Sequence, residues 1–345
     1  MRALRTVGFI LVLVAGGAAM SASDYFLEPN LTVAQITRER PGQNLPISRV
    51  ERYRMAGRFR PLLFWISRDN VGTGQIIWRH GPAGAVAYEL LIGSDPALAP
   101  KKLNRWGYFA ESTHGNTGQL FAVRNFQISK SEERSVGKLH PGPGNDGRLR
   151  VFSAIRATVR AGRSAAKRWT ARIPDNLTLR DVDRVLTTVE RAPGDARHHD
   201  EVVPDGVRSG FLAAVADLIN RSVQAHHTSP AAVKALREIS VSYVYWDSLY
   251  DLSLRSHEIK RQLDEGLLIT TIHGKFQIRK RLTGKVTRFE VSYGLDSCLA
   301  GIPVSIKYQP RWWLQAELLR ERESELSVPF EPNSDQPIRS PSTCP

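Results

Sequence analysis

The sequence predicts a mainly β protein: an antiparallel meander that forms a barrel or a strongly curved sheet, with two or three short helices inserted between about residues 178 and 237. Three successive hairpins between residues 239 and 319 carry this prediction. With turns at 247–248, 283–284 and 309–311, large apolar residues of one face lie opposite one another, in the pairs Tyr243 and Leu252, Phe276 and Val291, and Ile306 and Leu314. A slip of one residue would turn each apolar set outward, so three matching hairpins indicate a half-buried antiparallel sheet.

The first 23 residues have the composition of a secretory signal peptide. Arg2 and Arg5 precede an apolar run over residues 7–19, and small polar residues follow. The run is shorter than the roughly 20 residues that cross a bilayer. We therefore expect an exported protein, periplasmic or extracellular in a bacterial envelope, that is cleaved after Ser21 or Ser23. A signal-anchor helix is the alternative.

The length and net charge of the chain bear on its domain organisation and on its class of partner. The 345 residues, of which 41% are hydrophobic, suffice for one large β core or two smaller domains and exclude global disorder. A formal net charge of +14 suits an anionic partner such as a membrane surface. Because arginine strongly outnumbers lysine, which a GC-rich coding genome also produces, only local clusters of charge carry information. We expect no nucleic-acid partner.

Residues 24–130 are predicted to form an N-terminal β region. One hairpin places Ile76 and Trp78 opposite Leu90 and Tyr88. Two further strands are expected over 103–111 and 119–127, joined by a loop over 113–118. Residues 131–147 form a Gly/Pro-rich loop. This loop matches a dinucleotide-binding glycine fingerprint, but we reject that interpretation because it lies between a polar loop and β-branched residues.

Residues 148–320 are expected to continue the same fold. A hairpin over 150–173, with the three-residue loop Ala161-Gly162-Arg163, would pair Ile155 with Trp169. Its opposite face would then carry Arg156, Arg160, Arg168 and Arg172, with Arg156 opposite Arg168. A helix is the alternative, but Gly162 and the β-branched residues favour strands. The four guanidinium groups are candidate contacts for lipid head groups or other phosphates, and a solvated surface is the alternative.

Two helices follow this hairpin, and a third is expected near residue 230. Residues 178–181 resemble a capping box and open a helix whose apolar stripe is Val182, Val185, Leu186 and Val189. After a polar loop over 192–210, the clearest amphipathic pattern runs from about Ser209 to Val223. Ser229-Pro230 would begin the third helix. Residues 321–345 are predicted to be a disordered tail.

The two cysteines, Cys298 and Cys344, fit an oxidising compartment and could form a disulfide that ties the tail to the meander. One buried and one mobile thiol is the alternative.

No residues are assigned to catalysis, to a cofactor or to a metal. The pairs His198-His199 and His226-His227 offer imidazole ligands, but adjacent residues rarely converge on one ion. The loop Gly93-Ser94-Asp95-Pro96 is better explained as a turn than as a nucleophile site. A secreted hydrolase with a site in the 93–96 or 198–227 loops therefore stays an alternative.

The segment 299–318 begins with Ala-Gly-Ile-Pro-Val from Ala300 and contains a Tyr-Gln-Pro-Arg-Trp-Trp turn. It resembles the closing hairpins of uncharacterised secreted bacterial envelope proteins, which are grouped as families of unknown function. The resemblance implies export and a lipocalin-like or half-barrel β fold, and it transfers no catalytic residue.

These observations lead to three functional hypotheses. The first is an exported noncatalytic envelope protein that binds an apolar or amphipathic ligand, a lipid or glycolipid, within the curved sheet. The second is the secreted hydrolase. The third is binding of an anionic membrane surface through the arginine-rich hairpin.

Overall fold

The computed structural model describes residues 40–60, 66–126, 149–191, 194–229, 239–264, 267–295, 299–311 and 314–321, together with a few single residues between them. The predicted signal peptide, the Gly/Pro-rich loop and nearly all of the tail lie outside these residues. So do Cys298 and Cys344, and most of the third predicted helix.

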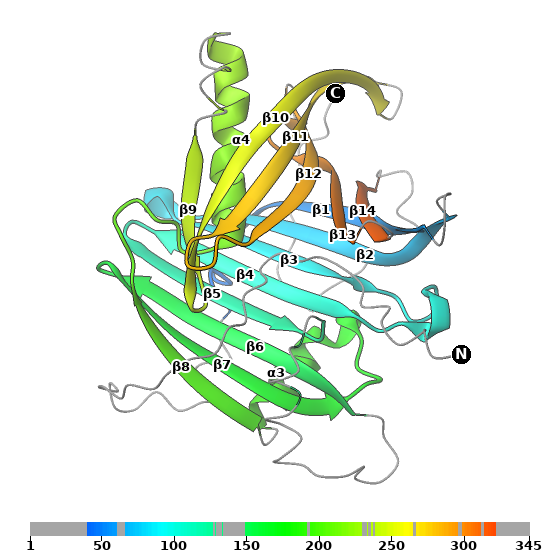
Figure 1. The fold of residues 1–345 in the computed structure, drawn as a ribbon, viewed down its shortest axis with the longest axis vertical. Coiled ribbons are helices and arrows are strands. Elements are labelled where there is room, and N and C mark those ends of the chain that lie inside the picture. The colour runs from blue at the N-terminus through cyan, green and yellow to red at the C-terminus, as the bar shows by residue number, and fades with distance from the viewer. Residues whose placement is uncertain are drawn as a thin grey trace.

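The described residues contain fourteen strands in one antiparallel sheet (Figure 1), which confirms the predicted mainly β meander. The first group is β1 (Ile47–Phe59), β2 (Ile66–His80), β3 (Val86–Ser94), β4 (Trp106–His114), β5 (Thr117–Arg124), β6 (Leu149–Arg160), β7 (Arg163–Pro174) and β8 (Gly194–Val202). The second is β9 (Ser240–Tyr245), β10 (Ser248–Asp264), β11 (Leu267–Lys280), β12 (Val286–Gly294), β13 (Pro303–Arg311) and β14 (Leu314–Arg320). The short 3-10 turns η1 (Pro82–Gly84), η2 (Pro100–Lys102) and η3 (Leu179–Asp181) lie between strands and helices.

A barrel or a strongly curved sheet was predicted, and of these two forms the barrel is not found. The sheet begins at β8, passes through β1 and β14 in its middle, and ends at β9. The edge strands β8 and β9 do not form a ladder, and an isolated bridge between Arg208 and Tyr243 joins β9 to the segment that follows β8. The chain between them contains the helix α4 (Phe211–Thr228), which contacts β9. We call the boundary between β8 and β9 the seam.

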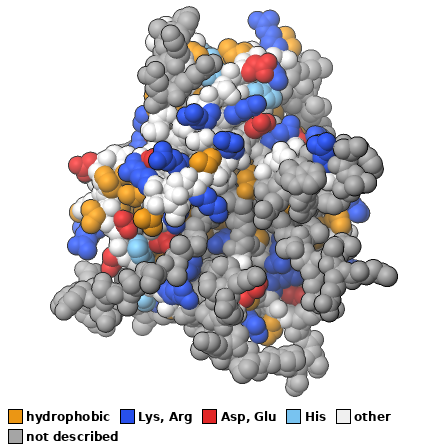
Figure 2. Space-filling model, viewed as in Figure 1, with side chains coloured by type: hydrophobic (Ala, Val, Ile, Leu, Met, Phe, Trp, Pro, Cys, Tyr) orange, Lys and Arg blue, Asp and Glu red, His pale blue; other side chains and the backbone are white. Residues whose placement is uncertain are grey.

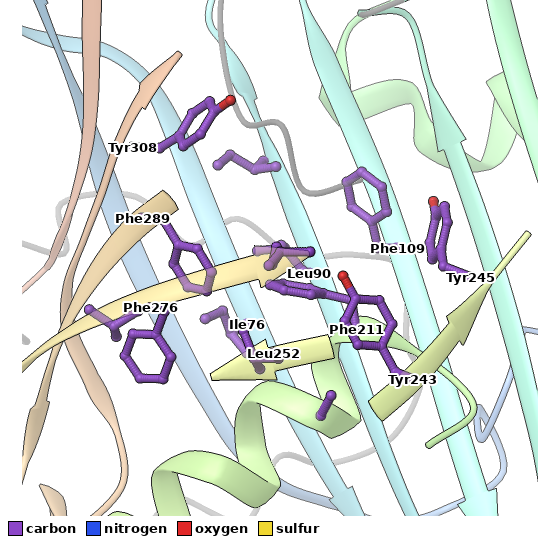
Figure 3. Close-up of a cluster of buried hydrophobic side chains, with 14 of the residues drawn as sticks. Ile76, Leu90, Phe109, Phe211, Tyr243, Tyr245, Leu252, Phe276, Phe289 and Tyr308 are labelled. Atoms are coloured by element: carbon purple, nitrogen blue, oxygen red, sulfur yellow. The ribbon is translucent and has the colours of Figure 1, made fainter. Parts of the chain in front are cut away.

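The inner face of the sheet packs around α4. Figure 1 shows β9–β12 crossing in front of strands of the first group, and one apolar cluster unites both groups with the helix. Figure 3 shows side chains of this cluster pointing toward one another: Ile76, Leu90, Phe109, Phe211, Tyr243, Tyr245, Leu252, Phe276, Phe289 and Tyr308. The large aromatic residues of the predicted hairpins therefore fill a shared core.

The outer face of β3–β7 packs against α3 (Val182–Arg191). The capping box predicted at its start is confirmed: Thr178 N–H donates to Asp181 Oδ2 at 2.8 Å, and Thr178 Oγ1 accepts from Arg180 N–H at 3.3 Å. The predicted apolar stripe is buried among outer-face residues that include Trp106, Phe152 and Trp169. These two helices, α3 and α4, are the α-helices of the described residues.

Several hairpins bury the predicted face of each strand, but their cross-strand partners differ from the predicted ones. Ile76 pairs with Leu90 and Trp78 with Tyr88, as predicted. Tyr243, however, pairs with Tyr250 and Phe276 with Phe289, each two positions from the predicted partner. Ile306 pairs with Leu318, four positions away. The first shift arises because Trp246, with a φ of 54°, begins the turn one residue earlier than predicted.

The predicted pairing in the arginine hairpin was wrong by one residue. Ala161 and Gly162 both have positive φ and form a two-residue turn, where a three-residue loop was predicted. Arg156 therefore lies opposite Lys167, and Arg168 lies opposite Ile155. A one-residue shift reverses faces, so the four arginines do not share one side of the sheet.

The predicted polar loop over 192–210 was also wrong in part, because β8 lies within it. Its residues Arg197, His198, Asp200 and Glu201 pair with β7 as an edge strand. Charged residues are common on edge strands because they discourage pairing with other chains.

Candidate functional site

The inner side of the seam brings together polar groups from β4, β5, β7 and β9 and from the segment before α4. Arg208 of that segment forms two backbone hydrogen bonds with β9. Its N–H donates to Ser242 O at 2.8 Å, and its carbonyl oxygen accepts from Val244 N–H at 2.9 Å. A small apolar group that includes Val159, Val203 and Val244 packs beside it. The start of α4 is therefore fixed against the edge of the sheet.

Glu111 of β4 caps the N-terminus of α4. The carboxylate accepts the N–H of Ala213 at 2.9 Å, and the residue is 2% exposed. The N-cap residue, Gly210, has no side chain to satisfy the first amides of the helix. A Cβ on Gly210 would lie 2.2 Å from Glu111 Cδ, so glycine permits the close approach of the carboxylate.

Burial raises the pKa of Glu111 from its ordinary value of 4.5 to about 7, although the amides of Leu212, Ala213 and Phe211 act in the opposite direction. Desolvation disfavours the charged form, whereas amide donors and the positive end of the helix dipole favour it. Near neutral pH this carboxyl group can therefore exchange a proton inside the core.

Two phenol groups of β9 lie close to Glu111. Tyr243 and Tyr245 are 0% and 5% exposed, and their hydroxyls have no hydrogen-bond partner among the described residues. Burial, together with Tyr250 and Glu111, raises the pKa of Tyr243 well above 10, and burial raises that of Tyr245 to about 12. Both phenols therefore keep their protons and are available as hydrogen-bond donors.

Ser209, next to the N-cap of α4, is a third buried group whose hydroxyl has no partner in the described part of the chain. It packs against Gly118 of β5, where a Cβ would lie 2.0 Å from Ser209 Cβ. A side chain at position 118 would therefore displace this serine.

Two arginines add positive charge beside Tyr245. Arg124 of β5 and Arg168 of β7 both lower the pKa of Tyr245 against the effect of burial. The Arg168 guanidinium lies 4.9 Å from the centroid of the Trp246 ring, a cation–π contact. We define the seam site as Glu111, Ser209, Tyr243, Tyr245, Arg124 and Arg168. It combines hydroxyl donors, cations and one titratable carboxyl group beside the apolar core.

The structure places the predicted anion-contact residues on two sides of the sheet. Ile155, which packs on the inner core, lies opposite Arg168, so Arg168 points inward, and strand alternation gives Arg172 the same face. Arg156 and Arg160 alternate with these and lie on the outer face. The hairpin therefore contributes one arginine to the seam site and does not form the predicted strip.

The residues considered for catalysis are not brought together. Ser94 Oγ donates to Leu103 O at 2.6 Å and accepts from Arg105 N–H at 2.9 Å, which is the predicted turn role. His199 contacts Trp246, whereas His226 contacts His257. The described residues contain no group of three His, Cys, Asp or Glu that could hold a metal ion.

Sequence reasoning missed Glu111 and treated Tyr243 and Tyr245 as plain core residues. A signal for Glu111 was present, because a carboxylate closes the otherwise uncharged run from Trp106 to Ala110. A buried charge in a strand indicates a specific partner. The sequence could not show that this partner is a helix N-terminus about 100 residues later.

Comparisons with protein-family models, with curated proteins and with solved structures found no match. Within the described residues, no helix is both long and apolar enough to span a membrane.

Proposed function

We propose that this protein is a noncatalytic binder of the bacterial envelope, whose ligand is amphipathic and has an anionic head group that contacts the seam site. The observation that carries the proposal is the pair of buried hydroxyls on Tyr243 and Tyr245, which have no described partner and lie near Arg124 and Arg168. Lipids and glycolipids with phosphate or carboxylate groups are the ligand class.

The energetic argument concerns the hydroxyls. A buried hydroxyl without a partner costs about 1–3 kcal/mol, and a ligand oxygen that accepts its hydrogen bond would recover that cost. Guanidinium groups bind phosphate and carboxylate oxygens in paired hydrogen bonds. Apolar residues beside the hydroxyls, such as Phe109 and Trp246, would contact the apolar part of the ligand. The site thus suits an amphipathic molecule with one charged end and one apolar end.

The proposal also predicts that ligand binding depends on the protonation state of Glu111. With a pKa of about 7 it is largely neutral in mildly acidic solution and largely ionised in alkaline solution. An ionised carboxylate would repel an anionic head group, so we expect binding to weaken as pH rises through 7.

The test uses the full chain, native mass spectrometry after gentle purification, and thermal shift with dodecyl phosphate as the added probe. Tyr245→Phe should weaken probe binding by about tenfold, the value of one hydrogen bond to a charged group. Tyr293→Phe is the matched control, because Tyr293 is equally buried on the inner face and its hydroxyl donates to Ser222 Oγ at 2.8 Å.

The two variants should also differ in stability without probe. Tyr245→Phe removes a hydroxyl that has no described partner and should be at least as stable as the wild type, whereas Tyr293→Phe loses a hydrogen bond and should be less stable. Equal probe affinity in the wild type and Tyr245→Phe would overturn the proposal. So would a probe response that is the same for dodecyl maltoside, which has no charge.

A further inference from the structure

The turn between β11 and β12 carries exposed apolar side chains. Residues 281–286 are all exposed, with Leu282 at 81% and Val286 at 42%. The turn is closed by Gly284 N–H donating to Lys280 O at 2.8 Å and Lys280 N–H donating to Lys285 O at 2.9 Å. Gly284 adopts a φ of 65°, which glycine accommodates readily. Leu282 therefore lies in a hydrogen-bonded turn and leaves its side chain in solvent.

Basic residues flank this leucine in the sequence. Between residues 275 and 288 the sequence contains no acidic residue and six basic ones, which are Lys275, Arg279, Lys280, Arg281, Lys285 and Arg288. Figure 2 shows Lys and Arg side chains spread over one face of the molecule, among hydrophobic, acidic and other side chains. We call Leu282, Val286, Arg279, Lys285 and Arg288 the basic tip.

Of the basic residues around this turn, two have carboxylate partners and lie outside the basic tip. Arg281 is paired with Asp251 at 2.7 Å, and Lys280 is buried near Asp247, with 3.8 Å between charged atoms. In contrast, no described carboxylate lies within ion-pair distance of Arg279, Lys285 or Arg288, although Arg279 still lowers the pKa of Asp251. Three exposed cations are thus available to an external anion.

A second hairpin with exposed apolar residues provides a comparison. The end of the β10–β11 hairpin exposes Leu268 at 66% and Ile259 at 51%. There Lys260 is paired with Glu258 at 3.2 Å, and residues 258–265 include three acidic residues and two basic ones. Its apolar exposure is similar, but its charge does not favour an anionic partner.

We infer that the basic tip docks on the surface of an anionic lipid bilayer, with Leu282 entering the interfacial layer and Lys285, Arg279 and Arg288 contacting lipid phosphates. An apolar side chain at the apex with cations around it matches a bilayer, in which an apolar layer lies beneath a layer of negative charge. The long stems of Lys285 and the arginines can cover apolar surface while their charges stay at the phosphates. This inference is independent of ligand binding at the seam site.

The test is flotation of the full chain with phosphatidylcholine vesicles that contain or lack phosphatidylglycerol. The wild type should float with the anionic vesicles at low salt and much less at high salt, because exposed charges are screened. Leu282→Asp, and separately Lys285→Glu combined with Arg288→Glu, should each reduce vesicle affinity by at least about tenfold. Because these side chains are exposed, all variants should keep the wild-type melting temperature.

Leu268→Asp is the matched control, since it places the same charge on a similarly exposed leucine of the other hairpin. It should bind vesicles as the wild type does. The inference is overturned if Leu282→Asp binds anionic vesicles as well as the wild type, or if Leu268→Asp is the variant that loses binding. Tyr245→Phe should leave flotation unchanged, and Leu282→Asp should leave dodecyl phosphate binding unchanged, so failure of one proposal is distinguishable from failure of the other.

Discussion

Replacing Glu111 by Gln should remove a pH dependence of stability that this one residue introduces between pH 4.5 and about 7. Below pH 4.5 the carboxyl group is protonated in the folded and the unfolded chain. Between the two values the unfolded chain releases the proton while the folded chain retains it, so rising pH favours unfolding. Above about pH 7 the group is ionised in both states, and the folded chain bears the full free-energy cost of burying the ionised carboxylate.

The size of the effect follows from the same two pKa values. The interval from 4.5 to about 7, at about 1.4 kcal/mol for each pH unit, corresponds to about 3 kcal/mol of unfolding free energy. No reduction for solvent screening is needed, because Glu111 is 2% exposed. Gln is neutral at every pH, and its amide oxygen can still accept the N–H of Ala213.

The assay is urea denaturation of the wild type and Glu111→Gln at several pH values between 4.5 and 8. The wild type should lose about 3 kcal/mol more than the variant over this range. Glu258→Gln is the control, because it makes the same substitution at a side chain that is 69% exposed. If Glu111→Gln keeps the wild-type slope, the buried carboxyl group does not behave as argued.

Two further changes test local features of the fold. Thr178→Ala removes the side chain that caps the turn before α3 and should lower the unfolding free energy by about 1 kcal/mol in the same urea assay. An unchanged midpoint would show that Asp181 caps the turn alone. Ala161→Asn should raise the melting temperature, corresponding to about 0.5–1 kcal/mol, because Ala161 has a φ of 50° that asparagine adopts more readily. A lower melting temperature would mean that the methyl group of Ala161 makes stabilising contacts that asparagine does not replace.

The alternation of apolar residues predicted which side of each C-terminal strand is buried, because that pattern has a period of two. It did not determine the register, since a shift by two or four residues keeps every face correct. The pairing of Tyr243 with Tyr250 is such a case. Turn chemistry should decide between these registers, but Trp246 occupies a left-handed position that sequence rules assign to Gly, Asn or Asp.

In the arginine hairpin the predicted register was wrong by one residue, so the predicted face was wrong as well. Choosing a three-residue loop over a two-residue turn shifted the pairing by one position, and this moved Arg168 to the wrong face. The seam site was also beyond prediction, because it requires β4 and β9 to meet across the curvature of the sheet. Local patterns do not encode that curvature.

The neighbours at the middle of the sheet, β1 and β14, are the first and the last strands among the described residues. Arg320 of β14 forms an ion pair with Glu51 of β1 at 2.6 Å, across a separation of 269 positions. Each group of strands can form from local hairpins, whereas the ladder between β1 and β14 must close a loop that includes most of the chain. During synthesis, β1 therefore keeps one edge unpaired until β14 forms, and an unpaired edge is open to pairing with other chains. Because of this strand order, the edge of β1 is protected from pairing with other chains only once β14 has formed.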